Sequence, residues 1–261
     1  MKKTILLHDA QNHISQNINR CIIELQQKSH NIIRNPVHGN LFSIYQYEKP
    51  EYIFLSASEY TQEFQDFLTD HSYDTNVFLF IDNEEHIQNS QLVEFWNSRS
   101  SLKIIANKNH KNRYTNCIAE YGDMYNEKVF YDRQLQRNDR IAIILSNDNN
   151  KNDILQEILY PNVFDHKLVV FNNPDFKSPV NLGILNSSDL AIVLNIYGAV
   201  LDMDQKLYLQ AQACKTKYYD ISNIQVKEAI LNQNFKISNL DLNNHTYLKF
   251  VTEKILPHIR N

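Results

Sequence analysis

The sequence predicts an α/β protein with two successive domains. Short apolar runs, typical of buried strands, alternate with segments in which apolar residues recur at helical spacing. The alternation pauses in a polar segment from 107 to 140 and then starts again. The 261 residues suffice for one or two domains of roughly 100 to 200 residues. Two such blocks predict two Rossmann-like domains that face a cleft.

The first block begins with a buried strand at 3–10 and an amphipathic helix at 13–30. The helix places one set of apolar residues on a single face, namely Ile14, Ile18, Cys21, Ile22 and Leu25. Apolar runs and their flanking residues then predict strands at 31–35, 41–47, 52–58, 76–83 and 101–109. Two segments with helical spacing, 58–68 and 90–98, complete this block.

The second block repeats the alternation from a new first strand at 140–147. Helices are expected at 151–160, near 180–187 and at 204–214, and strands at 167–173, 190–196 and 217–222. A last helix is expected at 244–256, before Pro257. We therefore expect an N-terminal domain at 1–135, a C-terminal domain at 136–243, and a final helix at 244–261 that packs back on the first domain.

Composition and charge describe a soluble globular protein without a marked preference for a partner. Hydrophobic residues make up 43% and charged residues 21%, and the net charge is -4, so non-specific binding to nucleic acid is not expected. Cys21, Cys117 and Cys214 are isolated in the sequence and are interpreted as reduced core thiols. No apolar run is long enough for a secretion signal or a transmembrane segment, so the expected location is cytoplasmic.

The second block carries a resemblance to a known family. The stretch "IAIILSNDNNKNDILQEIL" reads as a strand, a loop that ends in a lysine, and a helix, and "LQAQACKTKYY" follows later. These segments resemble the second domain of the retaining nucleotide-sugar glycosyltransferases of GT-B fold (the family 4 group), in which a Glu precedes a Glu-Ala-x-Ala-Cys-Gly segment by eight positions. In this chain Gln210 and Lys215 replace the second Glu and the Gly, and Asp202 stands eight positions before Gln210.

The resemblance implies a GT-B-like fold and a metal-independent sugar transfer from a nucleotide-sugar donor to an unknown acceptor, which could be a glycan, a protein or a nucleic acid. The nucleotide-sugar is the substrate, and no separate cofactor is implied. Lys151 and Asp202 would act in catalysis. The donor-binding set would comprise Asn147, Lys151, Tyr197, Gly198, Asp202 and Gln210.

General physical chemistry is consistent with these roles, but each residue could instead have a purely structural role. Lys151 follows the loop at the start of a helix, where an ammonium would neutralise a diphosphate, but it is equally well a solvated residue. Asn147 tolerates left-handed backbone, which this glycine-free loop would need. Gln210 could hydrogen-bond a ribose or lie on the helix surface. Asp202 could contact the sugar or cap the next helix.

Three further alternatives remain open. Asp202 and Asp204 form an Asp-x-Asp pattern like that of metal-dependent glycosyltransferases, but the two-block order favours the other fold. His8 and Asp9 follow the first strand and could face an acceptor, although an ordinary loop role is more common. Finally, the changes at Gln210 and Lys215 would also fit a glycosyltransferase-like protein that has lost catalysis and acts as a binding or interaction module.

Overall fold

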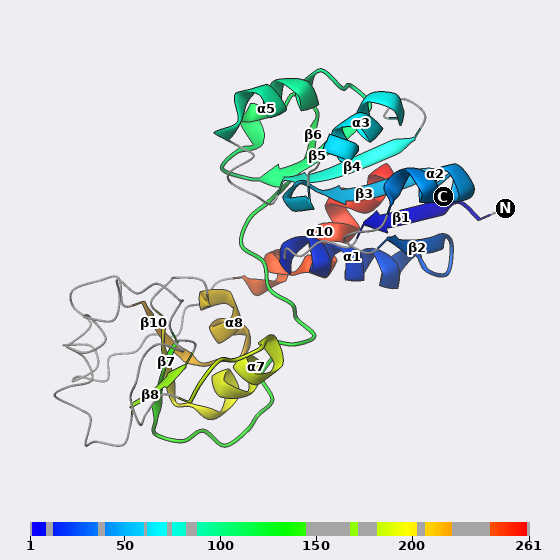
Figure 1. Ribbon diagram of the computed structural model, residues 1–261. Helices are drawn as coiled ribbons and strands as arrows, with labels where there is room; N and C mark the ends of the chain where they lie inside the picture. Colours follow the sequence, from blue (N-terminus) through cyan, green and yellow to red (C-terminus); the bar gives the residue numbers. More distant parts are fainter. Residues whose placement is uncertain are drawn as a thin grey trace. The chain divides into compact units, whose positions relative to one another are not determined.

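The chain forms two compact α/β units, each built on one parallel sheet (Figure 1). The computed structural model describes residues 2–8, 13–35, 40–59, 62–71, 75–81, 88–144, 168–171, 182–202, 207–220 and 241–259. Unit 1 comprises Met1–Met124 and Asn244–Asn261, and unit 2 comprises Tyr125–Asn243. The predicted α/β class is thus confirmed.

The sheet of unit 1 has six parallel strands in the order β2-β1-β3-β4-β5-β6. Their bounds are Thr4–His8 (β1), Asn31–Asn35 (β2), Tyr52–Ser56 (β3), Asn76–Ile81 (β4), Leu102–Asn107 (β5) and Cys117–Tyr121 (β6). The central strands β3 and β4 are buried on both faces, which explains why their sequences are continuous apolar runs.

Helices cover both faces of this sheet (Figure 1). One face packs around Phe67 and Trp96 and is covered by α2 (Leu41–Glu48), α3 (Gln62–His71) and α5 (Ser90–Asn97). The other face packs around Phe54 and Phe78, whose rings stack with centroids 4.4 Å apart, and is covered by α1 (His13–Gln26) and the C-terminal segment. Two short 3-10 turns, η1 (Ala57–Glu59) and η2 (Lys111–Arg113), lie in the connections.

The predicted strand at 41–47 is wrong, because this segment forms helix α2. Asn40 caps the helix by accepting the Ser43 N–H at 2.8 Å. Leu41, Ile44 and Tyr45 then share one face and pack into the core. The spacing of these three residues fits a helix, but the density of aromatic and β-branched residues favoured a strand.

The C-terminal segment belongs to unit 1 and packs against α1 (Figure 1, orange to red). It begins within η4 (Leu242–His245), whose first two residues belong to unit 2, and continues with α10 (Tyr247–Phe250), a π-helical turn η5 (Val251–Ile255) and η6 (Leu256–His258). Its side chains Tyr247, Phe250, Val251 and Ile255 are buried with the residues of α1. The segment from 244 onwards therefore completes the core of the first unit.

The sheet of unit 2 has four parallel strands in the order β10-β9-β7-β8. Their bounds are Ile141–Ile144 (β7), Leu168–Phe171 (β8), Ala199–Asp202 (β9) and Lys217–Asp220 (β10). Two helices, α7 (Ser187–Ile196) and α8 (Tyr208–Ala213), contribute Leu194, Leu209 and Ala211 to its core. The predicted helix at 151–160 lies outside the described residues.

Three further predictions about elements were wrong. The segment 190–196, predicted as a strand, lies in α7, and the strand follows at Ala199–Asp202. The helix expected near 180–187 begins only at Ser187, because Asn186 accepts the N–H groups of Ser188 and Asp189. The segment 190–196 is apolar at every position except Asn195, and so short an apolar run cannot be assigned to helix or strand by its period alone. Strand β6 also lies in the segment that was interpreted as a pause.

The segment that connects the two sheets packs into unit 2 from Tyr125 onwards. Tyr125 and Phe130 are part of the core of unit 2. The buried Asn195 of α7 accepts the N–H of Arg133 at 2.8 Å and donates to the carbonyl of Tyr131 at 3.1 Å. These contacts explain why the units divide after Met124, whereas the sequence placed the division at 135/136.

Arg137 bonds to the carboxyl ends of α7 and α8, the helices of unit 2 that the structure describes. Its Nη1 donates to the carbonyl oxygens of Leu194 at 2.8 Å and Tyr197 at 3.1 Å, at the end of α7. The same nitrogen lies 3.1 Å from the hydroxyl of Thr216, and Nη2 donates to the carbonyl of Cys214, which ends α8. A cation at this place satisfies helix-end carbonyls and complements the dipoles of both helices.

All three cysteines are free thiols, as the sequence predicted. Cys214 is fully buried in unit 2, and burial raises its pKa to about 11. Burial also raises the pKa of the Cys117 thiol. Both groups therefore remain protonated near neutral pH, and they serve as packing residues.

Candidate functional site

The candidate site lies at the carboxyl edge of the sheet in unit 2. Because all four strands are parallel, Ile144, Phe171, Asp202 and Asp220 end them at the same edge. Ile144 pairs with Asp202, so β7 ends beside this carboxylate. Asn147 and Lys151, which follow β7 in the sequence, lie outside the described residues. Ligands of open parallel sheets bind at this edge.

Asp202 is buried and holds the residue that precedes the next helix. Its Oδ2 accepts the backbone N–H of Leu207 at 2.8 Å, directly before α8, and the hydroxyl of Tyr218 at 3.1 Å. Only 2% of the residue is exposed. Leu207 is the N-cap residue, so Asp202 fixes the start of α8 without bonding the N–H groups of its first turn. Asp204, the other carboxylate of the Asp-x-Asp pattern, lies outside the described residues.

Gln210 lies in the short helix α8, on the chain segment that returns from the carboxyl edge. Its neighbours Leu209 and Ala211 are buried in the core of unit 2, while Gln210 itself is half-buried. The Oε1 atom is shielded from solvent and accepts no hydrogen bond from the described residues. A desolvated acceptor without a donor costs roughly 1 to 3 kcal/mol, so this oxygen would gain from a ligand hydroxyl.

Lys215, which stands where the resembled pattern has Gly, has a left-handed backbone conformation. Its φ is +54°, in the left-handed region that favours glycine. Its N–H donates to the Gln212 carbonyl at 2.9 Å, and the N–H of Thr216 donates to Ala211 at 2.8 Å, so α8 ends in a Schellman motif. An ion pair with Asp132 at 3.0 Å holds the lysine side chain.

Tyr197 and Gly198 lie before β9, at the other end of the strand from Asp202. At about 3.3 Å per residue, the four steps from Gly198 to Asp202 cover roughly 13 Å. A Cβ on Gly198 would lie 2.6 Å from the carbonyl oxygen of Asn138. The ring of Tyr197 packs edge to face on Phe171, with centroids 5.9 Å apart. Both residues thus have packing roles in unit 2.

In unit 1, the structure places His8 in a largely buried position at the end of β1. Its ring lies edge to face with Phe64, with centroids 6.5 Å apart, and 6% of the residue is exposed. Its carbonyl accepts the side-chain amide of Asn19 at 3.1 Å. Asp9 lies outside the described residues. These contacts give His8 a place in the core of the first unit.

The described residues contain neither a cluster of metal ligands nor a membrane-spanning helix. Among those residues, no group of three or more His, Cys, Asp or Glu side chains is arranged to hold a metal ion. The described helices also include none that combines the length and the apolar character needed to cross a bilayer.

Sequence comparisons detect no relatives. No family model matches the chain, and no curated protein matches it at a significant level.

Solved structures, in contrast, share the fold. The UDP-N-acetylglucosamine 2-epimerase of Methanocaldococcus jannaschii matches with a TM-score of 0.52 at 12% identity, covering 98% of this chain and 93% of that chain. A second UDP-N-acetylglucosamine 2-epimerase matches with a TM-score of 0.50 at 10% identity, covering 99% and 88%. A proposed enzyme of this kind from Listeria monocytogenes gives 0.54 at 7% identity, covering 88% and 82%. The likeness confirms a GT-B-like fold of two Rossmann-like domains.

Proposed function

We propose that unit 2 binds the nucleotide of a nucleotide-activated sugar and that the protein transfers this sugar to an acceptor. The observation that carries the proposal is the buried, unfilled acceptor Oε1 of Gln210, which would receive a hydrogen bond from a ribose hydroxyl. Gln210 occupies the position of the nucleotide-binding Glu in the family pattern. The left-handed Lys215, at the position of the pattern's Gly, supports this alignment.

The diphosphate would be bound by the loop after β7. Lys151 would neutralise the charge that develops on the leaving diphosphate, and Asn147 would help to shape the loop around it. Asp202 would contact the sugar from the neighbouring strand, because β7 and β9 end side by side. No metal is required in this scheme. Tyr197 and Gly198 are left out of the proposed site because their contacts serve packing.

A non-catalytic binding protein is the second candidate, and one observation favours it. The Oδ2 atom of Asp202 accepts two hydrogen bonds within unit 2, and a carboxylate engaged in this way is less available to a substrate. The neighbours of known structure are named as UDP-N-acetylglucosamine epimerases, so a nucleotide-sugar is the ligand class common to both candidates. Product analysis with a bound nucleotide-sugar would separate them.

The proposal predicts that nucleoside diphosphates stabilise the protein and that Lys151 contributes to this effect. A ligand at a hundredfold excess over its dissociation constant stabilises the native state by about 2.7 kcal/mol, which a thermal melt detects. Lys151→Met should weaken diphosphate binding about ten- to a hundredfold, since a charge-assisted contact contributes roughly 1.5 to 3 kcal/mol. Binding of the uncharged nucleoside should change little.

Lys217→Met is the matched control for this experiment. Lys217 is an exposed lysine of the same unit, at the amino end of β10, and its replacement should leave diphosphate binding unchanged. If Lys151→Met and the parent protein bind diphosphate equally tightly, Lys151 does not bind the phosphate, and the proposed phosphate site in this loop is wrong. If no nucleoside diphosphate or nucleotide-sugar shifts the melt at millimolar concentration, the proposed ligand class is wrong.

The ribose contact can be tested through Gln210 and the ligand together. We expect the parent protein to bind a nucleoside diphosphate about tenfold more tightly than its 2′,3′-dideoxy analogue. In Gln210→Ala this difference should vanish, because the acceptor is absent. Isothermal titration of both ligands with both proteins measures the coupling. If Gln210→Ala still binds the dideoxy analogue more weakly than the nucleoside diphosphate, another residue binds the ribose hydroxyl.

A further inference from the structure

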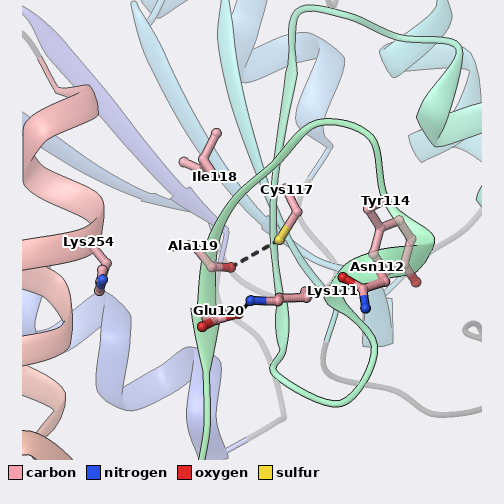
Figure 2. A pocket seen from close by; sticks show the side chains of 8 residues that line it. All are labelled: Lys111, Asn112, Tyr114, Cys117, Ile118, Ala119, Glu120 and Lys254. Carbon is pink, nitrogen blue, oxygen red and sulfur yellow. Dashed lines mark hydrogen bonds and ion pairs between the residues drawn. The ribbon is translucent and has the colours of Figure 1, made fainter.

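A groove follows the open edge of the sheet in unit 1 (Figure 2). Its volume is about 510 Å³. Its floor is the edge strand β6, from Cys117 to Glu120. Figure 2 shows one wall formed by the segment around Lys111 and Tyr114, and Lys254 on the helical segment opposite. The groove belongs entirely to unit 1 and is separate from the candidate nucleotide site.

The floor of the groove is an edge of the sheet, in which the Ala119 carbonyl accepts the Cys117 thiol at 3.3 Å. β6 is the last strand of the sheet and pairs with β5 on one side, and within the described residues no strand pairs with its other side. An edge strand in this state offers a row of N–H and C=O groups to a further strand. Extended peptides bind to such edges through their main chain, and side-chain contacts then add specificity.

The walls of the groove favour a single extended chain over a second sheet. The turn η2 and the π-helical turn η5 both contact β6, so the edge lies between two walls and not on a flat surface. Another copy of unit 1 would bring its own walls to the same place. The lining is mostly polar, whereas pockets for small molecules are mostly apolar, so main-chain recognition fits better.

The charges at the rim select for an acidic occupant. Lys111 forms an ion pair with Glu120 of β6, and this contact raises the pKa of the lysine. Lys254, on the other wall, is exposed and forms no ion pair with any described residue. It lies in the π-helical turn between the fully buried Val251 and Ile255, which fix its position. Turns of this kind occur frequently at functional sites.

We propose that this groove binds an extended polypeptide segment with acidic side chains, which adds to β6 as a further strand. The main chain of the segment pairs with the outer side of β6 along Cys117, Ile118 and Glu120. A carboxylate of the segment forms an ion pair with Lys254. The proposal is independent of nucleotide binding in unit 2, so either can fail without the other.

The test uses hydrogen exchange of the full-length protein with four probes. These are an octapeptide of alternating Thr and Glu, the same peptide with Lys in place of Glu, the Thr–Glu peptide with all amides N-methylated, and free glutamate at equal carboxylate concentration. We expect only the first to slow exchange of the amides in β6. The N-methylated peptide should fail because it cannot donate main-chain hydrogen bonds.

Charge reversal of Lys254 supplies the specificity test. Lys254→Glu should weaken binding of the Thr–Glu peptide about tenfold or more, since it places like charges together. Lys28→Glu makes the same charge change at an exposed position of unit 1 outside the groove, and should leave binding unchanged. If both variants lose the same affinity for the Thr–Glu peptide, the loss is caused by the change in net charge. The proposed ion pair with Lys254 is then wrong.

Three other results would overturn the proposal. If free glutamate slows hydrogen exchange of the β6 amides, the groove is a site for small anions and not for a peptide. If the amides of β6 are protected from exchange without any probe, the edge is already covered. Protection that is independent of protein concentration would mean that another part of this chain covers it, and protection that depends on concentration would mean that a second copy does. Unchanged exchange of β6 with all four probes would leave the groove without a peptide ligand.

Discussion

Replacing Arg137 with Met is expected to lower the free energy of unfolding of unit 2 by about 3 kcal/mol. Arg137 donates to the carbonyl oxygens of Leu194, Tyr197 and Cys214, which end two helices. Methionine keeps much of the apolar stem but removes every donor, so the carbonyls of Tyr197 and Cys214 lose the Arg137 hydrogen bonds and Leu194 keeps only the bond from the Thr216 hydroxyl. The helix dipoles also lose a nearby cation. Arg137→Lys should retain part of the stability, because it keeps the charge but not the forked geometry.

Hydrogen exchange in urea measures this effect where it should occur, at the amides of α7 and α8. The single tryptophan, Trp96, lies in unit 1, so its fluorescence follows the other unit in the same samples. Arg140→Met is the matched control, because Arg140 is exposed and its side chain forms no hydrogen bond with the described residues. Parent-like exchange of α7 and α8 in Arg137→Met would contradict the proposed role.

Gly198→Ala is expected to destabilise unit 2 by a similar amount, about 3 kcal/mol, through a steric clash. The new Cβ would lie 2.6 Å from the carbonyl oxygen of Asn138, which is backbone and cannot rotate away. The Gly198 N–H also donates to the carbonyl of Arg140 at 3.0 Å, so the two segments cannot separate without losing this bond. A thermal melt and exchange of the β9 amides would measure the loss.

Gly122→Ala is the control for the glycine substitution. A Cβ at Gly122 would meet only the flexible side chain of Lys108, at 3.3 Å, so we expect a change of no more than about 0.5 kcal/mol. If Gly198→Ala is as stable as Gly122→Ala, the approach of the Asn138 backbone does not restrict this position. If it is unstable but still binds nucleoside diphosphates at low temperature, the packing role of Gly198 is supported.

The sequence correctly predicted the elements whose residue patterns fit only a strand or only a helix. The buried strands at Tyr52–Ser56 and Asn76–Ile81 are apolar at nearly every position and too short for a core helix, and they form β3 and β4. Helix α1 has a polar face and an apolar face at the expected period. The alternation of such elements was enough for the α/β class and for two domains.

Other elements depended on contacts that are distant in the sequence. Helix α7 is apolar over most of its length, so only its cap at Asn186 and its packing on the sheet distinguish it from a strand. Strand β6 has Glu120 in its short run, and its pairing with β5 is what makes it a strand. The start of unit 2 was likewise decided by Tyr125 and Phe130, whose burial places them in the core of that unit.

The sequence alone also provided the resemblance on which the proposed site rests, since the spacing from Asp202 to Lys215 can be compared with a family pattern even where residue types differ. It could not determine what Asp202 touches, which depends on how β9, α8 and β10 come together. Nor could it show that Gly198 meets the backbone of Asn138, sixty positions earlier in the chain. Local periodicity records the face that an element buries, whereas the partner of each side chain is set by the order of strands in the sheet, which only the tertiary structure decides.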